Sequence, residues 1–476
     1  MSGRSESVAI WWQARLDRWL EPAILIAAMA VRVALALVNR QANDDHLQVA
    51  HLILQLQRLP VRSDCWECFQ PKLYHASLAG LFYLLPWLSS TQQIVLSQLI
   101  NVVAGGLTLL IIWRFLVWQV AGPMQRSALL ALLAFNPALS GINAQATNDS
   151  FAILFGTLAL YSAARFLTTP GTLAVKRRRD WLGMIAGTIL AALSKGTGLI
   201  VLVAILATLA LVAWQQLRAA RALPTAALGQ ATVLTAVFLL VVPVAGQYWQ
   251  NWQNYGSPFV INTKRDALPR LYEPTYVYWA GITSIADGYF TFRLDNMLEY
   301  PYDTYDDAGY PRHRNSLWSQ LYGAANLAQF EEFPLSWASW HPIVQNLGRV
   351  IFFLALLPTL AWLWGLFKGV WTTLQVVFRV QIGQPDAALT WLFTLAGWGY
   401  AVMIVLYTLQ YRSFVTMKAV YVMPGVLASV YFLARSSLGT GRRLGRRGLV
   451  LVVGTLSVLS LLNLADLGTL WYQLAK

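Results

Sequence analysis

Long uninterrupted apolar runs recur along this chain, and they constrain its fold more than any other feature. A transmembrane helix needs about 20 apolar residues to cross a hydrocarbon core that is about 30 Å thick. The runs cover residues 20–39, 93–118, 127–147, 150–167, 181–194, 197–215, 226–247, 344–366, 388–409, 417–434 and 448–471. This pattern predicts an all-α polytopic membrane protein with about 11 to 12 transmembrane helices.

The count depends on residues 73–88, an apolar run of about 16 residues that is too short to span comfortably unless the bilayer thins. We expect an interfacial or partly inserted helix there. Just upstream, LQVAHLILQLQ at 47–57 has the amphipathic pattern of a helix that lies on a membrane surface. The segment between the first two firm spans is therefore expected to carry interfacial helices.

The composition excludes an ordinary soluble protein, because 57% of the 476 residues are hydrophobic and only 12% are charged. A net charge of +14 would suggest nucleic acid as the partner of a soluble chain. Here the basic residues cluster in short links between apolar runs, so we expect membrane lipids and no nucleic acid as partners. No small-residue cleavage site follows the first run, which predicts an uncleaved first span.

The basic links also orient the spans, because cytoplasmic loops are enriched in Lys and Arg. The links are Arg114 to Arg126, residues 176–179, Arg218 with Arg221, Lys368 with Arg379, and residues 442–447. If these links and the N-terminus face the cytoplasm and 73–88 does not cross, residues 40–92, 148–149 and 249–343 face the other side. All five histidines fall on that side. We therefore expect an inner (plasma) membrane protein with its active site on the extracytoplasmic (periplasmic) face.

This organisation predicts three parts. Residues 1–248 form an N-terminal transmembrane module that includes the first outer loop, 40–92. Residues 249–343 form a large, aromatic-rich extracytoplasmic loop that we expect to be a small cap, and residues 344–476 form the C-terminal transmembrane helices.

Two adjacent acids, Asp44 and Asp45 in NDDHLQVAH, lie directly after the first span. They are either an ordinary solvated span end or catalytic groups. A carboxylate held at the interface can accept a proton from an attacking hydroxyl or amine, which is general-base chemistry. Alternatively, the pair could chelate a divalent metal together with His46 or His75.

The stretch SDCWECFQPKLYH, residues 63–75, contains a cation and both cysteines of the chain. Lys72 is either a snorkelling anchor or a contact for a lipid-linked phosphate. Cys65 and Cys68 favour a disulfide or free thiols, because zinc would need two more ligands and only His75 is near.

Further candidates sit at other span ends. Asp149 is either a helix cap or a carboxylate that steers donor or acceptor. Lys195, in LSKGTG, follows a run of about 14 residues and is expected below the membrane surface, where charges are usually functional or paired. Arg412 and Lys418 precede a late span on the same side. With Lys72, these cations would form a ring for an anionic lipid headgroup.

The order of these motifs resembles the GT-C membrane glycosyltransferases. A first span is followed by the acidic pair, an amphipathic stretch, a PxLYxxL motif, an Asn-Asp turn and SKGTG. The resemblance covers residues 20–215 and is to the branch of protein O-mannosyltransferases and the bacterial lipid A aminoarabinose transferase (glycosyltransferase family 39). YRSFVTMKAVYVMPG at 411–425 also resembles the family's late basic stretch.

The resemblance implies transfer of a sugar from a polyprenyl-phosphate donor to a glycan, lipid or protein acceptor, with inversion and without an obligatory metal cofactor. It makes Asp44 the base, with Asp45 beside it and Asp149 at the second loop carboxylate. We expect His46, Gln70 and His75 to line the substrate site. The family's His-Pro-Pro or Lys-Pro-Pro is here Gln70-Pro71-Lys72, so a charge is missing at Gln70.

Two other classes of protein fit parts of the sequence. A lipid or sugar transporter or flippase would explain the spans and a buried Lys195, but not a long aromatic loop on the same face as the acids. Transporters also often show repeated halves, and the sequence has no internal repeat. A non-enzymatic scaffold would not require acids that face cations.

Overall fold

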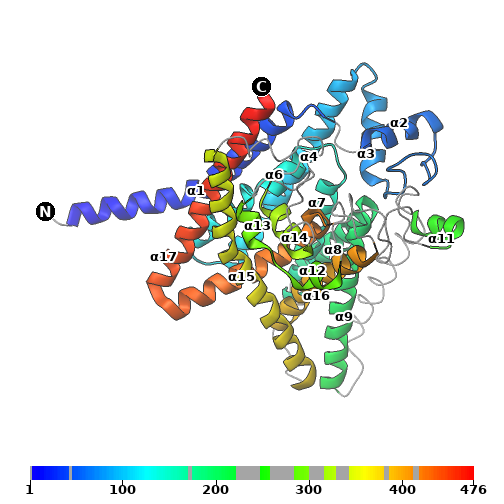
Figure 1. Ribbon diagram of the computed structural model, residues 1–476. Helices are drawn as coiled ribbons and strands as arrows, with labels where there is room; N and C mark the ends of the chain where they lie inside the picture. Colours follow the sequence, from blue (N-terminus) through cyan, green and yellow to red (C-terminus); the bar gives the residue numbers. More distant parts are fainter. Residues whose placement is uncertain are drawn as a thin grey trace.

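The computed structural model describes residues 3–41, 45–169, 174–220, 247–257, 284–299, 316–327, 342–379, 385–410 and 417–476. Within these residues every regular element is helical (Figure 1). The first half comprises α1 (Gly3–Val38), α2 (His46–Leu56), α3 (Leu73–Leu84), α4 (Ser90–Gln119), α5 (Pro123–Ala134), α6 (Pro137–Asn143), α7 (Asp149–Thr168), α8 (Ala174–Ser194), the 3₁₀ turn η1 (Gly196–Gly198) and α9 (Leu199–Ala220). The second half comprises α11 (Trp249–Tyr255), α12 (Ile285–Phe290), α13 (Leu294–Glu299), α14 (Leu317–Asn326), α15 (Pro342–Arg379), α16 (Pro385–Gln410), the 3₁₀ segment η7 (Ala419–Gly425) and α17 (Val426–Ala475).

The described helices confirm an all-α, multi-pass membrane protein. Eight of them are long and apolar enough to cross a bilayer. Large apolar side chains are exposed along these helices, for example Phe353, Leu357, Leu360 and Trp364 on α15. Such a surface is unfavourable in water and suits lipid, which is as apolar as the side chains themselves.

One apolar run departs from the single span expected over 127–147. It is divided into α5 and α6, which meet at Asn136. The residue before a proline avoids the helical conformation, and Asn136, before Pro137, has an extended ψ of 122°. Its side-chain oxygen accepts a hydrogen bond from the Leu139 backbone N–H at 2.8 Å, which caps α6. The sequence Asn-Pro therefore ends one helix and starts the next inside an apolar run.

Other apolar runs also differ from a single uninterrupted helix. The run at 417–434 begins as η7, a 3₁₀ segment that contains Pro424, and continues into α17. A kink at Gly445, with a φ of 59°, divides α17 into two segments, each long enough to span. The run at 226–247 lies almost wholly outside the described residues.

Glycines allow the closest helix pairing, between α7 and α8. A Cβ on Gly187 would lie 2.7 Å from the Ala159 backbone nitrogen, and one on Gly183 would lie 2.6 Å from the Ser162 hydroxyl oxygen. Small residues let transmembrane helices approach until their backbones touch. This packing holds the end of α8 against the start of α7.

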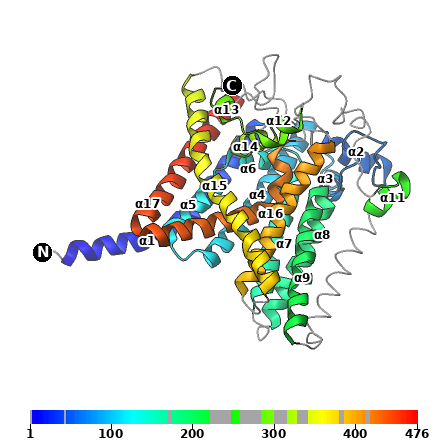
Figure 2. The same cartoon turned by 60° about the horizontal axis from the view of Figure 1, so that its bottom comes forward.

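The first outer loop folds as a helical hairpin beside the bundle. α3 has 12 residues, a length of about 18 Å, so it is too short to cross the hydrocarbon core as a helix. It packs on α2, and a disulfide between Cys65 and Cys68 closes the segment that joins them. Figure 2 shows α2, α3 and α6 at the same end of the bundle as α12, α13 and α14, away from the far ends of α9 and α15.

Candidate functional site

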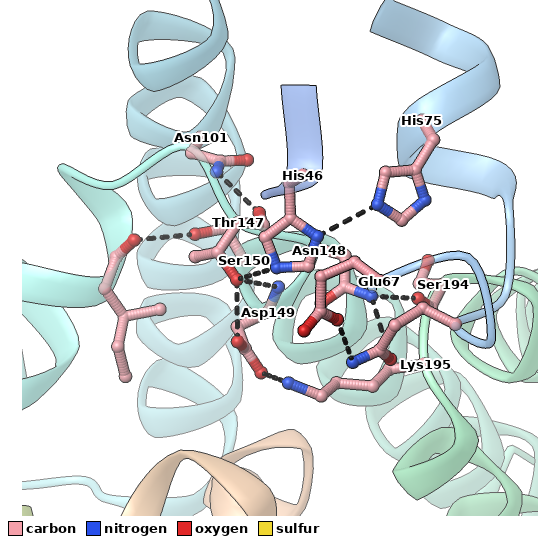
Figure 3. A network of polar contacts seen from close by, with 12 residues as sticks. His46, Glu67, His75, Asn101, Thr147, Asn148, Asp149, Ser150, Ser194 and Lys195 are labelled. Atoms are coloured by element: carbon pink, nitrogen blue, oxygen red, sulfur yellow. Dashed lines mark hydrogen bonds and ion pairs between the residues drawn. The ribbon is translucent and has the colours of Figure 1, made fainter. Parts of the chain in front are cut away.

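A buried ion pair lies at this end of the bundle, where three helix ends meet. The Lys195 Nζ is 2.5 Å from Asp149 Oδ1 (Figure 3), and both residues are 7% exposed. Asp149 begins α7, so its negative charge lies at the positive end of the helix dipole. The ring of Tyr421, on η7, lies 5.1 Å from the Lys195 nitrogen and adds a cation–π contact.

The chain reverses its direction after Lys195, and Gly198 allows this turn. α8 ends at Ser194, Lys195 is extended, and η1 then folds back on α8. A Cβ on Gly198 would lie 2.3 Å from the carbonyl group of Ala191, so only glycine fits at this position. Tyr400 donates a hydrogen bond to the Thr197 carbonyl oxygen at 3.0 Å and fixes the turn from α16.

Buried amides hold the turn that carries Asp149. Asn101, on α4, donates to the carbonyl oxygens of Gln145 at 2.6 Å and Thr147 at 2.7 Å. Asn148 donates to the Ser194 carbonyl oxygen at 3.0 Å, which joins the start of α7 to the end of α8. The geometry of the ion pair is therefore set by backbone contacts on both sides.

One helical turn away on α4, Gln98 binds the stem of the first outer loop. Its side-chain nitrogen donates to the carbonyl oxygens of Asn39 and, at 3.1 Å, of Gln41. Asn39 in turn donates to the carbonyl oxygen of Ala144 at 3.0 Å. The two turns that carry the predicted acids are thus attached to the same face of α4.

The two histidines of the first outer loop meet in the interior. His46 Nδ1 is 2.9 Å from His75 Nε2, and the rings stack with centroids 5.2 Å apart. His46 Nε2 is 3.3 Å from the hydroxyl oxygen of Thr147, which itself donates to Asp149 Oδ2 at 2.8 Å. Both histidines are buried. The sequence predicted both histidines on the same side of the membrane but did not show that they contact each other.

Lys72 is buried in its own loop. Its Nζ donates to the carbonyl oxygens of Cys68 and Gln70, each at 2.5 Å. Burial lowers the pKa of Lys72 to about 7, and the nearby Glu67 and Asp64 carboxylates only partly oppose that shift. Lys72 is therefore neither a snorkelling anchor nor presented to a headgroup in this conformation.

Gln70 links this loop to the ion pair. Its side-chain oxygen is 3.4 Å from the Asn148 amide nitrogen, and its own nitrogen donates to Glu67 at 3.1 Å. Gln247 donates to the carbonyl oxygens of Phe69 and Gln70, each at 2.9 Å, and holds the loop from the other side. Gln70 thus contributes hydrogen bonds at the position where the resemblance expected a charge.

The remaining predicted residues lie around this cluster or outside the described part of the chain. Asp45 is exposed at the start of α2 and makes no side-chain capping bond. Lys418 is half-buried and begins η7, which packs against η1. Asp44 and Arg412 lie outside the described residues.

The structure thus brings together Asp149, Lys195, His46, His75 and Gln70. Sequence reasoning missed Thr147, Asn101 and Tyr421. A signal for the amides was present, because Gln98 and Asn101 are polar residues three apart within an apolar run, where polar side chains need partners. In the described ranges, no group of three or more His, Cys, Asp or Glu side chains is placed to hold a metal ion.

No protein-family model matches the chain, and no curated protein is similar to it in sequence. Solved structures to which it is similar include the S. cerevisiae protein O-mannosyltransferase Pmt1–Pmt2 complex bound to the sugar donor (15% identity, TM-score 0.40, 53% of this chain and 35% of that chain). Another is the Archaeoglobus fulgidus oligosaccharyltransferase in complex with Zn and sulfate (14%, 0.48, 93% and 53%). A third is ArnT from Cupriavidus metallidurans bound to undecaprenyl phosphate (14%, 0.38, 89% and 79%).

The chain thus spans about a third and about half of the length of the first two of these proteins. Protein O-mannosyltransferases are also one of the branches that the order of sequence motifs resembles. We base the function proposed below on contacts within this chain.

Proposed function

We propose that this protein is a membrane glycosyltransferase. It moves a sugar from a polyprenyl-phosphate donor to a glycan, lipid or protein acceptor at the extracytoplasmic face of the inner membrane. The observation that carries the proposal is the buried Asp149–Lys195 pair, which lies at a junction of helix ends in a multi-pass protein. Burying such a pair is costly unless its charges are used or fully bonded.

The reaction needs a cation and a base. An acceptor hydroxyl attacks the anomeric carbon, its proton passes to a carboxylate, and the bond from that carbon to the phosphate oxygen breaks. Polyprenyl phosphate leaves with the electron pair. A cation beside the phosphate stabilises the charge that develops on the leaving oxygen, and it does so more strongly in a site that excludes water.

We assign the cation role to Lys195, and we expect Lys418 and Arg412 to assist it. Lys195 is held by Asp149 on one side and faces the Tyr421 ring on the other, so its position is fixed before a substrate binds. Preorganised charges of this kind require little rearrangement during the reaction. We do not include Lys72, because two carbonyl groups of its own loop accept its hydrogen bonds.

We assign the base role to Asp44, with Asp45 as its neighbour. Asp45 is exposed and begins α2, one residue before the buried His46. Asp45 therefore lies where the chain passes from solvent to the polar cluster. Displacement by one carboxylate base inverts the anomeric centre, and it requires no metal ion.

The Cys65–Cys68 disulfide supports the proposed face. Structural disulfides persist in oxidising compartments and are rare in the cytosol. The loop that carries this bond also carries Gln70, which contacts Asn148 beside the ion pair. The same argument therefore favours an extracytoplasmic active site.

A transfer assay with matched variants tests the proposal. Purified protein in lipid nanodiscs receives a radiolabelled polyprenyl-phosphate sugar and an envelope extract as acceptor, and released polyprenyl phosphate is measured. We expect release by the wild type and by Asp45→Asn, and none by Asp44→Asn or Lys195→Gln. Full activity of Asp44→Asn would overturn the assignment of the base. Movement of the intact donor across a vesicle membrane, without release of polyprenyl phosphate, would identify a transporter instead.

A further inference from the structure

Five side chains form a continuous buried chain of hydrogen bonds that joins four separate segments. It runs from Lys195 through Asp149 and Thr147 to His46 and His75 (Figure 3). All five residues are at most 7% exposed. The chain therefore links the α8–η1 junction, the α6–α7 turn, α2 and α3 through buried side chains.

The chemistry of the groups fixes the direction of each bond. Lys195 can only donate, so Asp149 accepts through Oδ1. The single hydroxyl hydrogen of Thr147 goes to Asp149 Oδ2, which leaves the Thr147 oxygen as an acceptor. His46 must then present a protonated Nε2 to that oxygen. A neutral His46 has only one ring N–H, so its Nδ1 accepts.

That acceptor must receive a proton from His75. The partner atom of His46 Nδ1 is His75 Nε2, which therefore carries the hydrogen. Burial keeps the pKa of His75 well below its usual value, the charge of Lys72 acts in the same direction, and a backbone hydrogen bond at Pro71 opposes the shift only in part, so His75 is neutral. Its Nδ1 is buried, and within the described residues no group meets it in good hydrogen-bond geometry.

Other charged and titratable groups around the dyad do not alter this direction. Tyr74, on α3, packs edge-on against both rings, with centroids 6.3 Å from His46 and 5.6 Å from His75. The charge of Lys72 disfavours a second proton on His75. Asp149 is the only acid among the five groups of the chain, and it lies beyond Thr147.

We propose that His75 and Thr147 are positioning residues, which hold His46 as its Nε2–H tautomer and fix the Asp149 carboxylate against Lys195. With Thr147 on one oxygen and Lys195 on the other, the carboxylate cannot rotate. His46 directly follows Asp45, so the same bonds anchor the start of α2 and hence Asp45. The consequence for catalysis rests on the glycosyltransferase function proposed above.

A purely structural role would not require this arrangement. An apolar side chain at position 75 would fill the same space and would avoid a buried nitrogen that no described residue meets in good hydrogen-bond geometry, which is unfavourable. His51 offers a comparison on the same helix. It bonds to Gln93 at 2.7 Å, packs against Phe82, and takes no part in the chain.

The test combines histidine spectroscopy with kinetics on the full-length protein in nanodiscs. Uniform ¹⁵N labelling of histidine reports the protonation of each ring nitrogen, and single His→Phe variants assign the signals. We expect neutral His46 with a protonated Nε2 in the wild type, in Thr147→Ser and in His51→Phe. In Thr147→Val and His75→Phe, which remove one neighbour in the chain, we expect this signal to shift or become a mixture of tautomers.

The kinetic arm measures release of polyprenyl phosphate. Misplacement of a reactive group can cost about 100-fold in rate, so we expect kcat to fall by about 10- to 100-fold in Thr147→Val and His75→Phe. We expect the KM for the donor to change little in these variants and Thr147→Ser to stay close to wild type. Thr147→Val keeps the shape of threonine but cannot hydrogen-bond, whereas Thr147→Ser keeps the hydroxyl and loses one methyl group, so loss of packing is separated from loss of the chain of hydrogen bonds.

Three results would overturn the proposal: an Nδ1–H or doubly protonated His46, an unchanged spectrum in Thr147→Val, or a wild-type kcat in both Thr147→Val and His75→Phe. If the wild type releases no polyprenyl phosphate, the glycosyltransferase proposal fails. The tautomer of His46 then still decides whether the chain of hydrogen bonds exists.

Discussion

Replacing Lys195 by methionine should destabilise the protein more than removing both members of its ion pair. At a separation of 2.5 Å, the gross attraction between Lys195 and Asp149 is about 7 kcal/mol for an effective dielectric constant of about 20. Desolvation of the two charges offsets much of that attraction. Breaking a buried pair from one side leaves an uncompensated charge, which typically costs about 3–5 kcal/mol. Replacing both partners by neutral residues of similar volume is often nearly neutral.

The assay is reversible unfolding of the purified protein in mixed micelles, with Lys195→Met, Asp149→Asn and the double variant compared with wild type. We expect the double variant to regain most of the free energy of unfolding that Lys195→Met loses. An exposed pair supplies the control. Arg58 and Asp64 are 2.8 Å apart on the surface of the first outer loop, and neutralising Arg58 should change stability little.

Activity must separate from stability in the same variants. The double variant keeps the fold but lacks the cation, so we expect it to release no polyprenyl phosphate even where it is as stable as wild type. Equal stabilities for Lys195→Met and the double variant would show that the buried charge of Asp149 does not need Lys195 to balance it. Wild-type turnover in the double variant would refute the assigned role of Lys195.

Other changes test the surroundings of the site. Asn101→Leu should cost about 1–3 kcal/mol in the free energy of unfolding, because two buried turn carbonyls lose their donor; Thr108→Val, which removes only a bond within α4, is the matched control in the same unfolding assay. Between pH 7 and about 10.5 the free energy of unfolding should rise by up to about 1.4 kcal/mol per pH unit, because the unfolded chain still holds the proton that folded Lys72 releases near pH 7. Lys72→Met should remove this slope. A slope that persists in Lys72→Met would contradict the assignment to Lys72. Gly187→Ala should lower the free energy of unfolding by about 1–3 kcal/mol, because the added methyl group forces α7 and α8 apart. Gly80→Ala, on an open face of α3, should raise it by about 0.5–1 kcal/mol. Thermal denaturation compares the two variants.

Hydrophobic length predicted most of the membrane fold. Eight helices match apolar runs of the sequence, and the short run at 73–88 is the 12-residue α3. The run at 127–147 shows where length alone fails, since it contains Asn136-Pro137 and is therefore two helices. The hydropathy of the run is the same whether or not it is broken, so only the local chemistry of Pro137 marks the division.

The candidate site was predictable as a set of residue types, but its pairings were not. Lys195 was expected to be buried, and burial requires an opposite charge or a ligand. Nothing in the sequence states that the partner is Asp149, 46 positions earlier, because that contact depends on how closely α7 and α8 pack. Lys72 shows the opposite case. Its position suggested a headgroup contact, but two carbonyl groups of its own loop accept its hydrogen bonds.

An arginine in the first span illustrates why polar residues inside apolar runs are the most informative positions in such a chain. Arg32 is 0% exposed, and among the residues that the structure describes no carboxylate accepts its hydrogen bonds. Its guanidinium donates to the carbonyl oxygen of Ala134 at 2.7 Å and to the Asn143 side-chain oxygen at 3.0 Å. Ala134 is the last residue of α5, so its carbonyl has lost its helical partner because Asn136-Pro137 breaks the run. The buried cation in one span thus donates to the carbonyl group that the broken helix in another leaves free.

That contact continues toward the site. Asn143, which accepts from Arg32, donates to the hydroxyl of Ser150 at 3.0 Å, and Ser150 follows Asp149 in the first turn of α7. The break in the apolar run therefore has a structural purpose beyond ending a helix. It starts the short helix α6, whose last residue, Asn143, is buried and bonds to the first turn of α7 beside Asp149.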